Sequence, residues 1–112
     1  MESELSGILE ARGFRVTVSR VSYRRITGGV HRTLRVVGRR GGAVVTVTIP
    51  EGGGPARLHV SARGAGEGEA EALESLGASV DVDEYGLVAV FKDVEPGEVG
   101  RLLRGVLDAI AP

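Results

Sequence analysis

Apolar residues recur with a helical period near the N-terminus. Leu5, Ile8 and Leu9 share one face over residues 3–12. Ser3 is a residue type that often caps the start of a helix. The pattern therefore predicts a short helix that buries one stripe of side chains.

A longer amphipathic helix is predicted at the other end of the chain. Pro96 suits the first turn, and apolar residues then recur at i, i+3, i+4, i+7, i+8 and i+11. These residues are Val99, Leu102, Leu103, Val106, Leu107 and Ile110. Among them, we expect Leu102, Leu103, Val106 and Ile110 to be buried.

Between these helices the apolar period changes to two, which is typical of strands. The alternating segments, separated by short glycine-containing turns, are 14–23, 30–36, 44–49 and 57–63. In the first segment the apolar phase slips between Val18 and Val21, and a β-bulge near Arg20 would explain the slip. The four segments predict an antiparallel meander with one face on a core and the other toward water or a partner.

A second short helix and a hairpin follow this meander. Ala70, Leu73 and Leu76 lie at helical spacing, and two strands at 79–83 and 87–92 flank the turn Asp-Glu-Tyr-Gly. The second strand holds a run that is apolar on both faces: Leu87, Val88, Ala89, Val90 and Phe91. Such a run suits a strand covered on both sides, or one whose second face meets another subunit. We therefore take it as a candidate dimer or partner interface.

The elements together predict an α+β fold, with an antiparallel sheet of about five or six strands and flanking helices. Their order is α-β-β-β-β-α-β-β-α, and the length of 112 residues favours a single domain over 1–112. The order ends in the acidic turn VDVDEYG, the apolar strand LVAVF and the helix VGRLLRGVLDAI. In this it resembles the type III secretion chaperone-like fold. That resemblance implies a dimer that binds a partner protein without catalysis.

The amino-acid composition excludes some kinds of chemistry and some locations for this protein. The chain has no cysteine, which excludes disulfides and thiolate chemistry, and no apolar run long enough to cross a membrane. The acidic N-terminus lacks the pattern of a signal peptide, so we expect a cytoplasmic protein. The absence of Asn and Gln suggests a thermophilic source, although a GC-rich genome explains the abundance of Arg equally well.

Charge divides sharply along the chain. Residues 1–63 carry 11 Arg and four acidic residues, a net charge of +7. Residues 64–112 carry three basic and 11 acidic residues, a net charge of −8. This segregation indicates a basic surface for an anionic partner, or two surfaces that attract each other.

Strand alternation places a candidate polyanion-binding set on the outward face of the meander. The set consists of Arg15, Arg35, Arg57, Arg63, His31 and His59. Arg side chains can hold phosphates without reading sequence. The more ordinary interpretation is a solvated face whose Arg residues pair with acids of the C-terminal half. Under that interpretation, nucleic acid binds weakly if at all.

No catalytic or metal motif is evident. His31 and His59 alone make an incomplete metal site, and neither has a Ser or carboxylate at a recognisable triad spacing. The glycine-rich segment 64–68 lacks the spacing of a phosphate-binding loop, and Glu67 and Glu69 would repel a phosphate there. We therefore predict no cofactor.

Two functional hypotheses follow. The first is a non-enzymatic protein-interaction module, a homodimer that binds a protein partner. The alternative is a nucleic-acid-binding protein that uses the Arg-rich face without sequence specificity. An enzyme whose site forms no local motif is a third hypothesis, because catalytic groups need not be close in sequence.

Overall fold

The computed structural model describes residues 1–111 and confirms the α+β fold with the expected order of elements. The helices are α1 (Glu2–Ala11), α2 (Glu67–Ser75) and α3 (Val99–Ile110), with a short 3-10 turn, η1 (Pro96–Glu98), before α3. The strands are β1 (Arg15–Arg24), β2 (Val30–Arg40), β3 (Ala43–Pro50), β4 (Ala56–Arg63), β5 (Ser79–Val82) and β6 (Gly86–Val94). They form one six-stranded sheet of order β1-β2-β3-β4-β6-β5. Every neighbouring pair is antiparallel, as expected.

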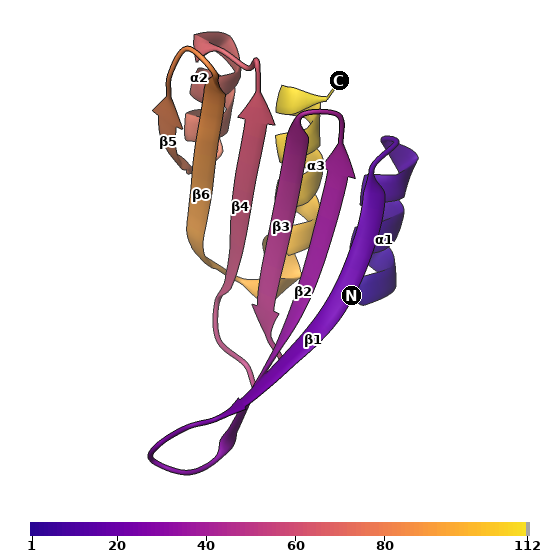
Figure 1. Cartoon of the computed structure of the whole chain (residues 1–112), viewed down its shortest axis with the longest axis vertical. Helices are drawn as coiled ribbons and strands as arrows, with labels where there is room; N and C mark the ends of the chain where they lie inside the picture. The colour runs from indigo at the N-terminus through magenta and orange to yellow at the C-terminus, as the bar shows by residue number, and fades with distance from the viewer. Residues whose placement is uncertain (112) are drawn as a thin grey trace.

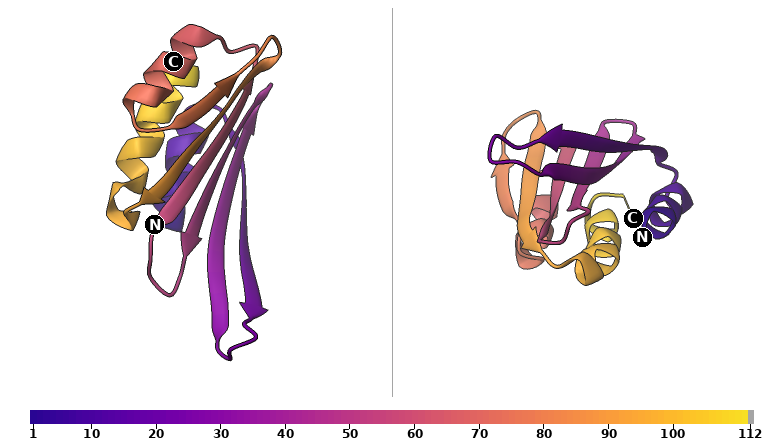
Figure 2. Two further views of the ribbon diagram at one scale, coloured as in Figure 1. Left: turned by 90° about the vertical axis from the view of Figure 1, so that its left-hand side faces the viewer. Right: turned by 90° about the horizontal axis from the view of Figure 1, so that it is seen from below.

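The helices all lie on one face of the sheet, which leaves the other face without a covering layer (Figure 1, Figure 2). Helix α1 packs on β1 and β2, α2 packs on β5, and α3 lies between the two other helices. Side chains from this face of the sheet and from the helices form the core, and both Phe14 and Phe91 belong to it. The molecule is therefore built of two layers, and the face opposite the helices is the place for a binding surface.

Two details of the helices differ from the sequence-based expectation. Helix α1 begins at Glu2 with Met1 as its N-cap, so Ser3 is not the cap. In α3, Leu103 and Val106 are buried, whereas Leu102 and Ile110 are only half-buried. The apolar stripe of α3 is wider than the contact between the helix and the sheet, so residues at its margins keep some exposure.

The predicted bulge near Arg20 is wrong. Strands β1 and β2 pair without interruption from Arg15 opposite Arg39 to Arg24 opposite Val30. Val21 therefore points to the face opposite that of Val18. No helix covers this end of the β1–β2 hairpin, so neither of its faces is buried. The apolar residues there therefore need not all point to one side.

A register shift does occur between β4 and β6. It falls between Ala56 and Leu58 of β4, opposite Val94 and Phe91 of β6. Asp93 at this point has a φ of 56°, which lies in the left-handed region. The irregularity bends β6 toward the turn that leads into α3.

The far ends of β1 and β2 extend past the rest of the sheet as a two-stranded ribbon (Figure 1). We call residues 21–32 the arm. Residues 21–30 are all exposed, and the arm contributes to the long dimension of the molecule, which measures 45 Å against 26 and 23 Å. Sequence periodicity does not distinguish the arm from the rest of the hairpin.

Candidate polyanion-binding face

The uncovered side of the sheet, here called the open face, carries the outward residues of the strands. Alternation along each strand and the register between strands place the following residues on it: Arg15, Thr17, Ser19, Thr33, Arg35, Val37, Arg39, Val44, Thr46, Thr48, Arg57, His59, Ser61, Arg63, Ser79, Asp81, Val88 and Val90. All four arginines of the predicted set therefore share one face. Hydroxyl side chains lie between them.

Two groups of arginines on this face are close neighbours. Arg35 of β2 and Arg57 of β4 flank Thr48 of β3 in one row across the sheet. Two strand spacings separate their backbones by about 10 Å. Arg15 and Arg39 lie directly opposite each other on β1 and β2. Like charges directly opposite each other repel and lower the stability of a sheet, so this pair destabilises the pairing of β1 with β2.

The arginines of the open face lack ion-pair partners within residues 1–111, and the carboxylate of Asp81 on β5 lies only at the edge of that face. Strands β1–β4 contain nine Arg and no acidic residue. Within residues 1–111, none of the ion pairs involves Arg15, Arg35, Arg57 or Arg63. The expectation that these residues pair with acids of the C-terminal half is therefore wrong. The physical reason is that α2, which holds many of those acids, lies on the opposite side of the sheet (Figure 2).

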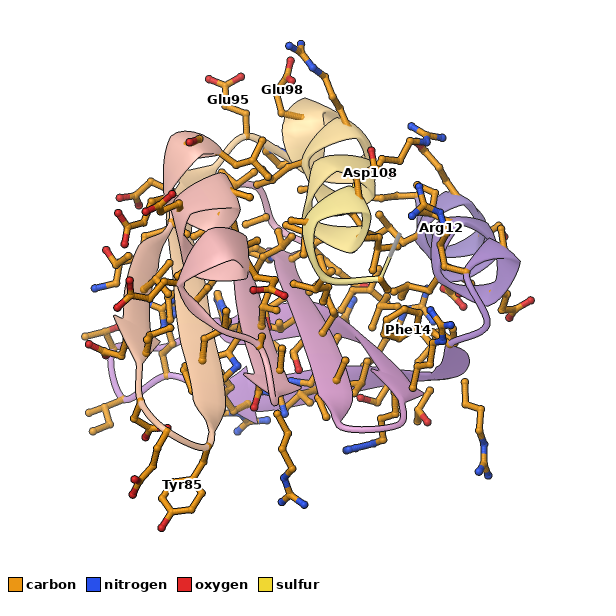
Figure 3. The ribbon with its side chains drawn as sticks, turned by 90° about the horizontal axis from the view of Figure 1, so that it is seen from above. Arg12, Phe14, Tyr85, Glu95, Glu98 and Asp108 are labelled. Atoms are coloured by element: carbon orange, nitrogen blue, oxygen red, sulfur yellow. The ribbon has the colours of Figure 1, made fainter. Side chains whose placement is uncertain are left out.

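Two arginines that lie off the open face, Arg20 and Arg12, do have acidic partners. Arg20 donates to Glu2 Oε2 at 2.6 Å and to Glu51 Oε1 at 2.9 Å, which ties β1 to α1 and to the loop after β3. The hydrogen bond with Glu2, and to a smaller extent the one with Glu51, raises the pKa of Arg20. Arg12 pairs with Asp108 and so links α1 to α3 (Figure 3). Arg20 and Arg12 thus differ from the arginines of the open face, none of which forms an ion pair within residues 1–111.

His31 and His59 both lie on the outward side of their strands, but the structure does not bring them together. His59 is opposite Thr46 in the centre of the sheet, whereas His31 is opposite Tyr23 in the arm. Arg25 Nη2 donates to His31 Nδ1 at 2.8 Å, and the rings of Tyr23 and His31 are 4.9 Å apart. In residues 1–111 no three His, Cys, Asp or Glu side chains gather as metal ligands would.

The candidate interface at Leu87, Val88, Ala89, Val90 and Phe91 needs correction. Leu87, Ala89 and Phe91 point toward the helices and are buried in the core. Only Val88 and Val90 reach the open face, and Val88 is 40% exposed. Strand alternation makes this division, so at most two of the five residues can meet a partner.

A shallow hollow of about 460 Å³ lies at the end of the open face near the turn between β5 and β6. Its lining mixes Arg63 with the carboxylates of Asp81 and Asp83, and Tyr85 projects from the adjacent turn (Figure 3). Ser61 is the only serine or threonine among the lining residues, and no histidine lines the hollow to act as a base. The hollow is thus an extension of the charged surface with mixed sign.

The glycine-rich segment before α2 offers no free anion site. The N–H of Gly66 donates to Glu69 Oε2 at 3.0 Å, so a side chain of the same helix already satisfies this end. Glu67 adds a second negative charge in the first turn. Glu67 and Glu69 therefore lie at the start of α2, where the sequence predicts that they repel a phosphate.

Sequence reasoning missed two features of the basic surface. Arg39 lies beyond the predicted strand segment 30–36, yet it continues the alternation of Arg35 and Val37 and lies on the open face. The arm was also missed, although the absence of acids from residues 21–32 is visible in the sequence. Extending the period-two pattern to the Gly-Gly turn at 41–42 would have found Arg39.

Comparison with known proteins finds no matching family model, curated protein or solved structure. The resemblance to type III secretion chaperones rests on the order of elements and stays a prediction. Over residues 1–111, no helix is long and apolar enough to cross a membrane.

Proposed function

We propose that the protein binds the phosphate backbone of nucleic acid on the open face, without reading base sequence. One observation carries the proposal. Five arginines, Arg15, Arg35, Arg39, Arg57 and Arg63, occupy one uncovered face built from four strands that contain no acidic residue. Such a surface attracts polyanions and holds them through charge-assisted hydrogen bonds.

The remaining side chains of the face favour phosphate over base recognition. Thr46 and Thr48 of β3, with Ser61 of β4, can donate to phosphate oxygens. Both phenylalanines are in the core, so β3 and β4 present no Phe, Tyr or Trp ring on which a base could stack, and His59 offers a single small imidazole. Contacts of this kind fix a nucleic acid on the surface and are indifferent to its sequence.

A net charge of −1 does not oppose this function. Association responds to the local field: the acids of α2 lie on the other side of the sheet, and those around β5 lie at the edge of the open face, where of its arginines only Arg63 is near them. A bound polyanion would also relieve the repulsion between Arg15 and Arg39. Binding of a polyanion is thus favoured by its attraction to the arginines and by the reduced repulsion between Arg15 and Arg39.

The test is a titration with single-stranded and duplex nucleic acid at two salt concentrations. If five phosphates are contacted, affinity falls about 500-fold between about 50 and 200 mM salt, because each contact contributes about −0.9 to the slope of log K against log salt. The variant carrying Arg35→Glu and Arg57→Glu removes two contacts. It should bind about 100-fold more weakly at the lower salt.

A matched control separates the open face from net charge. Arg101→Glu with Arg104→Glu makes the same change in charge on exposed positions of α3, on the helix side of the molecule. This variant should retain binding within a few fold. Absence of binding by the native protein at the lower salt, or equal losses in the two variants, would refute the proposed function.

A second candidate function is self-association through the four valines of the open face, which alternate with polar residues across the sheet. The half-buried side chains of Val37, Val44 and Val90 and the more exposed Val88 lie on that face. If two copies pair here, Val88→Asp should lower the molecular mass measured by sedimentation. Val82→Asp, at a site of similar exposure (37%) on the other face, should leave it unchanged. A native protein that stays monomeric at all concentrations would exclude this candidate.

A further inference from the structure

We infer that the arm, residues 21–32, is a β-ribbon that enters the major groove of duplex DNA. This inference rests on the proposed function, and it adds a preferred substrate and a second contact region. The arm is separate from the centre of the open face, because it extends beyond the strands β3 and β4 (Figure 1).

The shape of the arm matches the groove. It consists of two paired strands, from Val21 opposite Thr33 to Arg24 opposite Val30, closed by the turn around Gly28. No helix covers either of its faces (Figure 2). The major groove of B-DNA is about 12 Å wide and about 8.5 Å deep and admits a two-stranded ribbon. The paired part of the arm spans about 10 Å before the turn begins, so its tip can reach the floor of the groove.

The charge of the arm also favours DNA. It carries Arg24, Arg25 and Arg32 and no acidic residue. Arg24 and Arg32 project from the same face of the ribbon, because Val30 and Ser22 are their cross-strand partners. A ribbon inserted between two phosphate backbones would present both of these cations to the same wall of the groove. Two such arms from separate copies would repel each other, which argues against an arm-to-arm dimer.

Local contacts hold the arm in one conformation. The Arg25 N–H donates to Gly29 O at 3.1 Å, and the Gly28 N–H donates to Arg25 O at 3.0 Å. Gly28 and Gly29 have φ values of 94° and 84°, which a residue with a side chain rarely adopts. On one face the ring of His31 contacts Tyr23 and accepts from Arg25. A preformed ribbon loses little conformational entropy on binding.

The tip of the arm carries an apolar residue that has no role in the core. Ile26 is fully exposed, and Val30 is 58% exposed. Because both side chains are exposed, they do not contribute to the hydrophobic stabilisation of the fold. In the major groove an apolar side chain can contact the methyl group of thymine, which offers Ile26 a partner.

Duplex RNA provides a discriminating comparison. Its major groove is deep and too narrow for protein side chains to read, whereas its phosphates remain available. A protein that used the open face alone would bind both duplexes through phosphates. A ribbon that needs the major groove adds affinity only for the DNA duplex.

The experiment compares a DNA duplex of about two helical turns with an RNA duplex and a DNA single strand of equal length. The native protein should bind the DNA duplex most tightly. Arg24→Ala with Arg32→Ala should weaken duplex DNA binding at least about tenfold and lower the salt slope by about 2, since each lost phosphate contact contributes about 0.9. Ile26→Ser, which changes no charge, should weaken duplex DNA binding alone.

Controls make the possible failures distinct. Arg101→Ala with Arg104→Ala removes the same charge from α3 and should not change the preference for duplex DNA. Native binding that depends on Arg35 and Arg57 but not on the arm would overturn this inference and leave the proposed function standing. No native binding to any probe would overturn both. Arm variants that lower the molecular mass and leave DNA affinity intact would assign the arm to a second copy of the chain, and would also overturn the inference.

Discussion

The packing of α1 on β2 can be tested at a single glycine. Gly38 of β2 is buried beneath Leu9 of α1. A Cβ atom at position 38 would lie 2.9 Å from Leu9 Cδ2 and 3.1 Å from Leu9 Cδ1. Both distances are shorter than an ordinary van der Waals contact of 3.4–4 Å. Leu9 has no exposed surface and is surrounded by the core, so it has little room to move.

The expected cost of Gly38→Ala follows from two opposing effects. Overpacking a core in this way costs about 1–3 kcal/mol. Replacing glycine also restricts the unfolded chain, which returns about 0.4–1 kcal/mol. We therefore expect the free energy of unfolding to fall by about 1–2 kcal/mol, measured by urea denaturation with an unchanged m-value.

A double-mutant cycle with Leu9→Ala identifies the cause. Leu9→Ala alone should cost about 2–5 kcal/mol because it leaves a cavity. In that background the new methyl group at position 38 enters the vacated space, so Gly38→Ala should cost nothing or stabilise the protein. The two substitutions should couple by at least about 1 kcal/mol. If their effects instead add within about 0.5 kcal/mol, Leu9 does not lie over Gly38 and the placement of α1 is refuted.

Three further stability predictions use the same denaturation assay. Leu103→Ala should lower the free energy of unfolding by about 2–5 kcal/mol and Leu102→Ala by clearly less, because only Leu103 is fully buried; equal losses would contradict the orientation of α3. Gly86→Ala should cost at least about 3 kcal/mol, since φ is 153° and the new Cβ would lie 2.3 Å from the backbone oxygen of Ala62; a loss below 1 kcal/mol would be inconsistent with that contact. Gly7→Ala should stabilise the protein by about 0.5–1 kcal/mol, because this position of α1 is exposed with open space around it, and a destabilised variant would show that the site is packed.

Much of the architecture is determined locally by the sequence. The stripe of α3 and the alternation of the four-strand segment follow directly from side-chain periods of 3.6 and 2. The same alternation puts Arg35 and Arg57 on one face, because residues two apart in a strand must point the same way. These features need no knowledge of distant contacts.

Two errors arose where the local pattern had no tertiary constraint. The change of apolar phase at Val21 predicts a bulge, but β1 pairs with β2 without interruption into the arm. Likewise, the apolar run at 87–91 could not show which of its faces would be covered. Only the position of the helical layer decides where a sheet stops being buried.

The state of the open face was decided by the tertiary structure alone. The sequence contains enough carboxylates to neutralise every arginine, and the net charge of −1 suggests that it does so. Folding places α2 and its acids on the side of the sheet opposite Arg35 and Arg57, so these charges are separated by the core. Periodicity in one strand specifies the face on which its own residues lie, but pairing of charges depends on the distance between elements remote in sequence, which only the packed fold establishes.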